Sequence, residues 1–391
     1  MDLERAVAGV GLREWLAVGR VIASGRLSRY GGDGDSHVDR FEAAFARKIG
    51  VDHVLTVANG TGALICSLVA AGIGPGDEVL VPAYTWIATA AAPLAVGAVP
   101  VLVDIDETLT MDPDDIVRRI TPATKAIIPV HMANMVCDMD RIMRIAEEHG
   151  LIVIEDACQA VGATYKGRRT GSIGHAGAFS FNQFKNINVG EGGAVATSDR
   201  RLLSRARIYH DVGSVFRGHL DTQNEPQFPG INLKASQIQG AMLNVQLRKL
   251  DPMIRRLRDR YSAMSRTLQR AGLRVGPHND RDNAIGLHVI FDSPGEASAF
   301  AARNRRGVYR LYDSSRHVFS NWQPVLAQRC IHPRLDPYQW ASRRVDYSDE
   351  ACAPSLDLLK RTCRIGLGEQ YPLALMKFSA RKMVQGHERK R

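Results

Sequence analysis

The chain has 391 residues, 45% of them hydrophobic and 24% charged, which excludes a largely disordered protein and suits a large domain followed by a smaller one. Its formal net charge is +10, and basic residues are spread along the whole length up to Lys390 and Arg391. Since no zinc-finger spacing or RNA-binding aromatic motif accompanies them, nucleic acid is not an expected partner, whereas a phosphorylated or nucleotide-linked substrate would be attracted.

The N-terminus is charged from Asp2 and lacks the basic start and apolar core of a secretion signal. No apolar run reaches membrane-spanning length, so we expect a cytoplasmic protein without a membrane span. The six cysteines lie far apart and form no CxxC pair, which favours reduced, buried thiols.

From about Val54, short β-branched runs alternate with helical stretches rich in small residues, a pattern typical of helices packed on a mostly parallel sheet. The expected strands are His53–Val57, Glu78–Val81, Val99–Val103, Ala126–Pro129, Ile152–Glu155, Ala178–Phe181 and Gly193–Thr197. The expected helices are Gly62–Ala71, Ala88–Ala95, Asp138–His149 and Arg200–Tyr209. The first part of the chain is therefore predicted to be an α/β domain.

The pattern changes after Leu247. Residues Pro252–Leu268 predict a long amphipathic helix with a proline in its first turn, leading out of the first domain, and we place the boundary near Asp251. The remainder has weaker periodicity and is expected to form a small α+β domain.

The residues from Ile154 to Gly193 carry most of the candidate chemistry. Asp156 follows an apolar strand and should lie at the carboxyl edge of the sheet, where open α/β sheets bind ligands. A carboxylate there can keep a pyridinium nitrogen protonated, which makes that ring an electron sink. Lys185 follows the aromatic-rich run Phe179–Phe184, whose partial burial favours the neutral amine that a Schiff base needs.

Two further features accompany this lysine. Ser180 offers a hydroxyl to a phosphate group, and glycines at 190, 192 and 193 permit close backbone approach. Taken alone, Lys185 would be a surface lysine, Asp156 a helix cap and the glycines an ordinary turn. Their order and spacing together favour the chemical interpretation.

This combination resembles the DegT/StrS-type sugar aminotransferase family, whose members use pyridoxal 5'-phosphate (PLP) and share the fold type I architecture of aspartate aminotransferase. The resemblance runs from about Ser24 to Leu250. Besides the lysine block it rests on Val38–Phe45, Asn59–Leu64, Pro82–Thr89, Asp104–Asp106, Thr121–Ile127, Val130–His131 and Asp138–Asp140.

The resemblance implies two domains. Residues 1–250 would form the PLP-binding large domain with a mostly parallel sheet, and an N-terminal segment that could pack on the small domain. Residues 251–391 would form the smaller α+β domain with its basic tail.

The resemblance also implies roles for individual residues. Lys185 would carry PLP as a Schiff base and move protons, and Asp156 would pair with the pyridine nitrogen. Gln159 would lie near the phenolic side of the ring and Trp86 would stack on its face. Without the resemblance, Trp86 could equally be a core aromatic, and Gln159 would be a helix-surface residue.

The phosphate of the cofactor has its own set of expected contacts. Gly60, Thr61 and Gly62 lie between a strand and a helix, so their amides and the helix dipole could cradle a phosphate, with Thr61 and Ser180 adding hydroxyls. Asn232, in a segment that reaches the neighbouring subunit in the family, would touch the phosphate there. The resemblance thus implies a homodimer with shared active sites.

The chain departs from the family pattern at three places. Asn59 replaces a small serine before the phosphate loop, Lys234 stands where arginine is expected, and Ala133–Asn134 replaces a glycine-containing turn. These departures leave the substrate open. His317 could reach a sugar from the small domain, although a structural histidine is an equal alternative.

The function implied is transfer of an amino group from glutamate or glutamine to a keto-sugar, nucleotide-linked or phosphorylated, or to a cyclitol ketone, in amino-sugar or antibiotic and glycan biosynthesis. A PLP-dependent deoxysugar dehydratase is an alternative, but in such family members histidine typically replaces the lysine. A non-catalytic regulatory homologue is another alternative, which the intact set Asp156, Gln159, Ser180 and Lys185 disfavours. No metal site is expected, and acceptor, donor and direction stay open.

Overall fold

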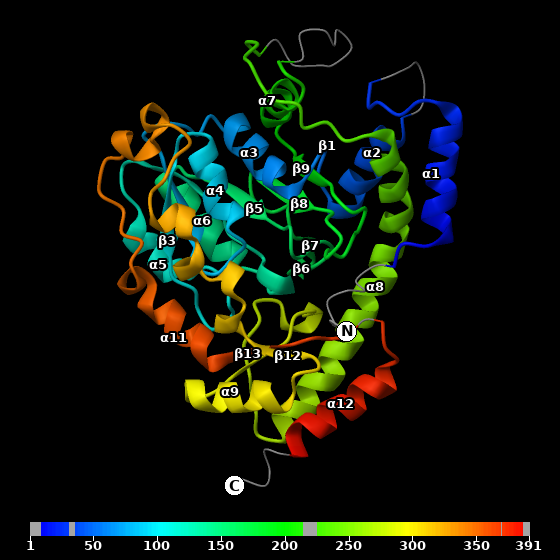
Figure 1. The fold of residues 1–391 in the computed structure, drawn as a ribbon, viewed down its shortest axis with the longest axis vertical. Helices are drawn as coiled ribbons and strands as arrows, with labels where there is room; N and C mark the ends of the chain where they lie inside the picture. Colours follow the sequence, from blue (N-terminus) through cyan, green and yellow to red (C-terminus); the bar gives the residue numbers. More distant parts are fainter. Residues whose placement is uncertain (1–8, 31–35, 214–224, 369, 386–391) are drawn as a thin grey trace.

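A computed structural model describes residues 9–30, 36–213, 225–368 and 370–385 (Figure 1). The last residues of the basic tail, 386–391, lie outside this description. Within the described part, no helix is long and apolar enough to cross a bilayer. The six cysteines are free thiols, and four of them are buried.

A seven-stranded sheet forms the centre of the larger part. Its strands, in chain order, are β1 (His53–Val57), β2 (Glu78–Pro82), β3 (Val99–Val103), β4 (Thr124–Ile127), β5 (Ile152–Asp156), β8 (Ala176–Ser180) and β9 (Gly193–Thr197). Their order across the sheet is β1-β9-β8-β5-β4-β2-β3. Only β9 runs antiparallel to its two neighbours, β1 and β8. All seven predicted strands are confirmed, with ends that differ by at most two residues.

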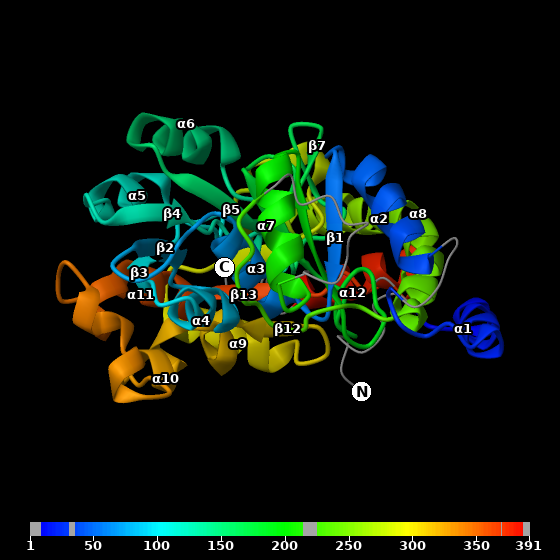
Figure 2. The same cartoon turned by 90° about the horizontal axis from the view of Figure 1, so that it is seen from above.

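Helices cover both sides of this sheet. They are α2 (His37–Ile49), α3 (Gly60–Ala70), α4 (Ala88–Ala95), α5 (Pro113–Arg119), α6 (Met139–His149) and α7 (Arg200–His210). Figure 2 shows α4 on one side of β2–β4 and α5 and α6 on the other. α3 packs on β5, β8 and β9 between α4 and α7. Because parallel strands are buried on both faces, their sequences are apolar runs rather than alternating ones.

The long helix α8 (Gln237–Arg270) corrects one prediction. It begins at a capping box in which Ser236 accepts the Gln239 N–H and the Gln239 side chain accepts the Ser236 N–H, so Pro252 lies in its interior and not in its first turn. An interior proline costs about 3 kcal/mol. Buried apolar side chains before and after Pro252, such as Leu250 and Ile254, offset this cost because they keep the helix packed. The domain boundary expected near Asp251 falls inside α8, and its position stays a prediction.

The C-terminal part contains a four-stranded antiparallel sheet in the order β10-β11-β13-β12. Its strands are β10 (Arg274–Val275), β11 (His288–Ile290), β12 (Val308–Arg310) and β13 (Thr362–Ile365). α9 (Pro294–Arg303) and α11 (Ala353–Arg361) pack on β12 and β13. The expected combination of a mostly parallel α/β sheet with a smaller α+β part is therefore confirmed.

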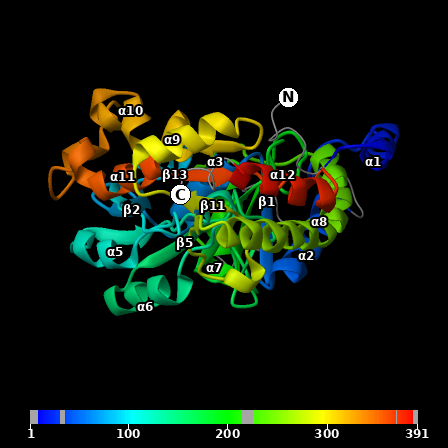
Figure 3. The same cartoon turned by 90° about the horizontal axis from the view of Figure 1, so that it is seen from below.

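Two terminal helices lie against α8. Figure 3 shows α12 (Leu373–Gln385) beside it. α1 (Leu12–Ser24) also contacts α8, through a buried Glu14 that accepts a hydrogen bond from Gln246 at 2.7 Å and forms an ion pair with Lys249 at 2.5 Å. The N-terminal segment is thus anchored on the first half of the long helix.

A buried histidine in the smaller sheet makes stability depend on pH. Nε2 of His288 donates to the Glu107 carbonyl oxygen at 2.9 Å, and burial lowers the pKa of His288 to about 4. The unfolded chain therefore binds one more proton than the folded one between about pH 6.5 and pH 4. The neutral imidazole of His288 therefore costs no stability above pH 6.5. As the pH falls from 6.5 to 4, the free energy of unfolding decreases by about 3 kcal/mol because of this group.

We therefore expect His288→Gln, whose amide nitrogen can also donate to Glu107, to flatten this dependence. Urea unfolding at pH 7 and at pH 4.5 would measure it, with the wild type losing about 2 kcal/mol more than the variant over that range. Equal losses in both proteins would contradict the assignment. His149→Gln, a substitution on an exposed residue, is the control.

Candidate functional site

Asp156, the last residue of β5, is only 4% exposed. Its Oδ2 accepts a hydrogen bond from the Thr89 hydroxyl at 2.9 Å, and its Oδ1 accepts the Cys158 N–H at 3.1 Å. No helix starts here, so Asp156 is not a helix cap. Within the described ranges, no lysine, arginine or histidine forms an ion pair with it. Because a buried, unpaired carboxylate is costly, the site is complementary to a cationic group of a ligand.

Thr89 is a site residue that the sequence arguments did not single out. It is buried in α4, and its hydroxyl also hydrogen-bonds the buried Thr85 hydroxyl at 2.8 Å. The two threonines therefore orient the carboxylate of Asp156 from the adjacent strand-to-helix connection. Thr85 precedes α4 and Thr89 lies in its first turn, so no helical spacing signals this pair in the sequence.

The loop that carries Lys185 connects β8 to β9. Lys185 is half-buried, and its N–H donates to the Asn182 carbonyl at 2.9 Å. The neighbouring Asn186 side chain donates to the Val161 carbonyl at 2.8 Å and to Oδ1 of Asn134 at 3.1 Å. These hydrogen bonds of Asn186 hold the middle of the loop against the segments that follow β4 and β5.

The N-terminus of α3 forms a close contact with the end of β8. Asn59 caps α3, since its Oδ1 accepts the Gly62 N–H at 2.7 Å, which explains why asparagine can replace serine here. A Cβ on Gly60 would lie 2.8 Å from Cβ of Ser180. The amides of Gly60 and Thr61 have no acceptor within the helix, whereas that of Gly62 is already used. An anion bound here could therefore accept hydrogen bonds from the amides of Gly60 and Thr61 and from the Ser180 hydroxyl.

A glycine of β9 permits this arrangement. A Cβ on Gly193 would lie 2.3 Å from the Asn59 carbonyl oxygen, so no other residue fits there without moving the backbone. Gly190, in the same loop as Lys185, has a φ of 84°.

The other predicted residues lie at different depths. Trp86 is 42% exposed and is therefore not a core aromatic. Gln159 lies half-buried in the turn after β5, not on a helix, and its carbonyl accepts the Asn134 N–H at 3.0 Å. Asn232 is exposed and forms a bridge with Asp211. Its neighbour Leu233 accepts the Ala58 N–H at 2.7 Å, so Asn232 lies beside the strand that leads into α3.

The other two departures from the family pattern also have structural counterparts. Ala133 and Asn134 have φ angles of 53° and 68°, so they adopt the left-handed conformation that a glycine would supply. Asparagine tolerates it better than alanine does. Lys234 forms an ion pair with the buried carboxylate of Asp211.

Glu155, next to Asp156, has a different task. Its buried carboxylate accepts the N–H groups of Gly171, Ile173 and Gly174 at 2.5–2.7 Å and a hydrogen bond from Nε2 of His131 at 2.9 Å. Nδ1 of His131 accepts the Cys137 N–H, so Nε2 carries the proton. Glu155 thereby holds the connection that leads into β8 and, at its end, Ser180.

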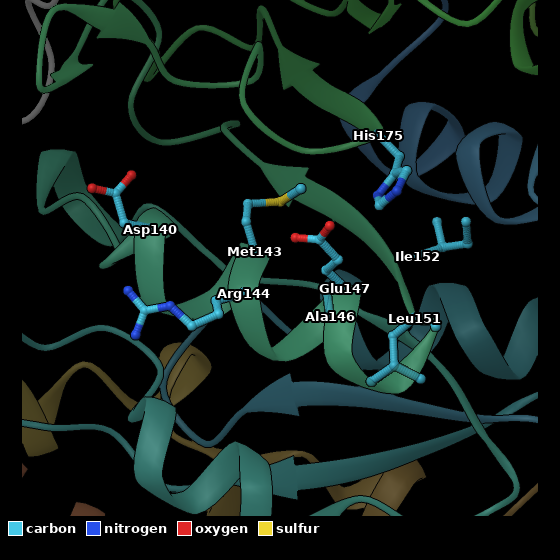
Figure 4. Close-up of a pocket in the computed structure, with 9 residues that line it drawn as sticks. Asp140, Met143, Arg144, Ala146, Glu147, Leu151, Ile152 and His175 are labelled. Carbon is cyan, nitrogen blue, oxygen red and sulfur yellow. The ribbon is translucent and has the colours of Figure 1, made fainter.

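A groove at the opposite edge of the sheet is separate from this site. Figure 4 shows its lining, which includes Asp140, Arg144 and Glu147 of α6 together with His175. Ile152 and His175 belong to the amino-terminal side of β5 and β8, whereas Asp156 and Ser180 are at the carboxyl ends. The candidate functional site therefore lies at the carboxyl edge, as expected.

Much of the chain is similar to known proteins. The model of the DegT/DnrJ/EryC1/StrS aminotransferase family matches residues 13–313. GDP-perosamine synthase of Caulobacter vibrioides is 46% identical over 214 residues, which cover 54% of this chain and 56% of the relative. L-glutamine:2-deoxy-scyllo-inosose aminotransferase of Streptomyces kanamyceticus is 39% identical over 244 residues, which cover 60% of this chain and 57% of the relative.

Structural similarity extends over nearly the whole chain. The crystal structure of 3-amino-5-hydroxybenzoic acid synthase superimposes with a TM-score of 0.80 at 27% identity, covering 98% of each chain. By contrast, the sequence alignments span less than two thirds of the two relatives named above.

Proposed function

The chain belongs to the DegT/DnrJ/EryC1/StrS aminotransferase family, and from this membership we propose that it is a PLP-dependent enzyme that transfers an amino group to a keto-sugar or a cyclitol ketone. The donor would be glutamate or glutamine. The names of the relatives support this acceptor class, because one makes a GDP-linked amino sugar and another uses L-glutamine and a cyclitol ketone.

The observation that carries the proposal is the buried carboxylate of Asp156 without a cationic partner in the described structure. A protonated pyridine nitrogen would supply the missing positive charge. The amides of Gly60 and Thr61 and the hydroxyl of Ser180 suit the phosphate, and the exposed ring of Trp86 suits a flat heterocycle. The residues present therefore fit PLP.

Each side chain has a distinct task in this proposal. When bound, PLP supplies an electron sink that stabilises negative charge on the substrate carbon. Asp156 keeps its positive partner protonated, and the threonine pair keeps Asp156 oriented. Nζ of Lys185 holds the cofactor and then accepts and returns the proton that moves between carbons. Gln159 would lie at the phenolic side of the ring.

The proposal is tested by the visible absorbance of the purified protein before and after borohydride reduction, followed by mapping of the modified peptide. We expect a cofactor-sized mass increase on Lys185. A protein that binds no chromophore, or a modification on another lysine, would overturn the proposal.

Lys185 also distinguishes amino transfer from the alternative function, dehydration of a deoxysugar. In the resemblance described above, dehydrating members have histidine in place of this lysine. The amine of Lys185 thus supports amino transfer.

We further propose a homodimer in which Asn232 reaches the partner's site. Support comes from apolar side chains that α1 leaves uncovered, among them Trp15, which is 70% exposed, with Leu12 and Ile22. Ile231, beside Asn232, is also exposed. Such apolar surface is typical of an interface. Light scattering should give twice the chain mass of 43.0 kDa, and a monomer at micromolar concentration would contradict the proposal.

The phosphate cradle leads to a prediction on cofactor affinity. Gly60→Ala would place a methyl group 2.8 Å from Cβ of Ser180 and 3.0 Å from Sγ of Cys158, which forces the cradle apart. Overpacking of this kind costs about 1–3 kcal/mol, so the Kd for PLP should rise about 10- to 100-fold. Titration of the apoprotein, followed by absorbance, measures it.

Gly74→Ala is the matched control for this change. The nearest atom to a Cβ at that position lies 3.8 Å away, and its φ is not positive, so the added methyl group has room. An unchanged Kd in Gly60→Ala would show that α3 does not hold the phosphate.

A further inference from the structure

The backbone of His317 is fixed to the loop that carries Trp86. The His317 carbonyl accepts the Thr85 N–H at 2.9 Å, and the Phe319 N–H donates to the Ala83 carbonyl at 3.1 Å. Between these two hydrogen bonds, Val318 forms a bridge with Tyr84. A segment from the C-terminal third is therefore clamped onto the connection between β2 and α4.

Buried groups stabilise the same segment. The indole of Trp322 is 1% exposed, and its Nε1 donates to the Arg316 carbonyl at 3.3 Å. The turn that presents the imidazole of His317 is therefore held by a large core side chain as well as by the clamp.

The His317 ring lies beside Trp86, which is proposed to stack on the cofactor, and one of its nitrogens has no partner in the described part of the chain. Its centroid lies 5.7 Å from that of Trp86 and 6.4 Å from that of Tyr84. Nδ1 pairs with the Ser314 hydroxyl at 3.2 Å. Nε2 has no hydrogen-bond partner in the described part of the chain, and because the ring is only half-buried this nitrogen can be reached by a ligand.

The surroundings of the ring keep it uncharged. Burial, and then the guanidinium groups of Arg316 and Arg364, lower the pKa of His317 to about 4. The positive charge of Lys185 lowers the pKa of His317 in the same direction. At neutral pH, His317 therefore offers a neutral nitrogen that can exchange a hydrogen bond with a hydroxyl group.

We propose that His317 recognises the amino acceptor by a hydrogen bond between its free Nε2 and a hydroxyl group of the keto-sugar or cyclitol ketone. This inference rests on the proposed function and deepens it. The amino donor enters as a carboxylate, which is matched by a guanidinium group and not by a neutral imidazole. His317 is therefore a specificity residue for the acceptor half-reaction alone.

Two variants separate hydrogen bonding from packing. His317→Phe keeps a ring against Trp86 and removes the hydrogen bond, whereas His317→Gln keeps a nitrogen that can hydrogen-bond. His149→Gln, on the exposed end of α6, is the control. The donor half-reaction is followed by cofactor absorbance with L-glutamine and L-glutamate. The acceptor half-reaction is measured with 2-deoxy-scyllo-inosose, with GDP-4-keto-6-deoxy-D-mannose and with 2-oxoglutarate, which has no hydroxyl on its carbon chain.

For His317→Phe we expect kcat/KM for the better hydroxylated ketone to fall about 10- to 100-fold, mainly through KM. The donor half-reaction and the reaction with 2-oxoglutarate should stay within about twofold, and His317→Gln should recover most of the loss. Equal losses in both half-reactions, or identical behaviour of Phe and Gln, would overturn the inference. A wild-type enzyme that aminates neither hydroxylated ketone would instead overturn the proposed function.

Discussion

Replacing Lys185 by alanine should lower the rate of both half-reactions by about 10³-fold or more. The reason is that Lys185 has both tasks in the proposed function, which are holding the cofactor and moving the proton. Thermal unfolding should change little, because the Lys185 side chain forms no hydrogen bond or ion pair in the described structure and only its backbone N–H is used. Single-turnover absorbance with L-glutamate measures the effect.

Two further measurements make this prediction specific. Lys125→Ala removes an exposed lysine whose ammonium group donates only to the Pro122 carbonyl, and it should leave the rate unchanged. Added methylamine should restore part of the activity of Lys185→Ala, since a small amine can occupy the vacated space. A variant that retains a tenth of the wild-type rate would show that the proton is carried by another group.

Asp156→Asn should lower kcat by about 10²- to 10³-fold while the protein folds normally. Asparagine can keep both observed hydrogen bonds, because its oxygen can accept the Cys158 N–H and its amide can donate to the Thr89 hydroxyl. Only the negative charge is lost, and with it the stabilisation that Asp156 is proposed to give to a protonated ring nitrogen. Steady-state kinetics and the absorbance spectrum of the bound cofactor would measure the loss.

Thr89→Val tests the orientation of the same carboxylate. It removes one hydrogen bond to Oδ2 and leaves the charge, so its kcat should fall by only about tenfold or less. If Thr89→Val and Asp156→Asn had equal effects, the position of the carboxylate would matter and its charge would not.

The strands of the larger sheet could be predicted because burial on both faces gives short, uniformly apolar runs. Val99–Val103 and Gly193–Thr197 were predicted with the ends that the structure shows. The start of α8 could not be predicted in the same way. Pro252 suggested a first turn, whereas the packing of the helix on the rest of the chain keeps it continuous for 15 further residues before that proline, from Gln237.

Some residues of the candidate site could likewise be predicted from the sequence, and others could not. Asp156, Ser180 and the α3 amides follow from the order of strands and loops, since the carboxyl ends of parallel strands meet at one edge. The hydrogen bond from Thr89 to Asp156 joins residues 67 positions apart, so no local pattern contains it. The contact of His317 with Trp86 joins parts of the chain that are more distant still. Whether Asn232 touches a phosphate across a dimer stays a prediction.

Because Glu155 and Asp156 end β5, the register of this strand decides which carboxylate reaches which partner. Successive residues of a strand face opposite sides. Glu155 therefore binds backbone amides of its own chain, while the carboxylate of Asp156 is proposed to bind a ligand. A shift of β5 by one residue would exchange these assignments: the loop before β8 would lose its anchor, and the ligand would meet a carboxylate one methylene longer. An insertion or deletion in β5 would therefore inactivate the enzyme even if every side chain named above were retained.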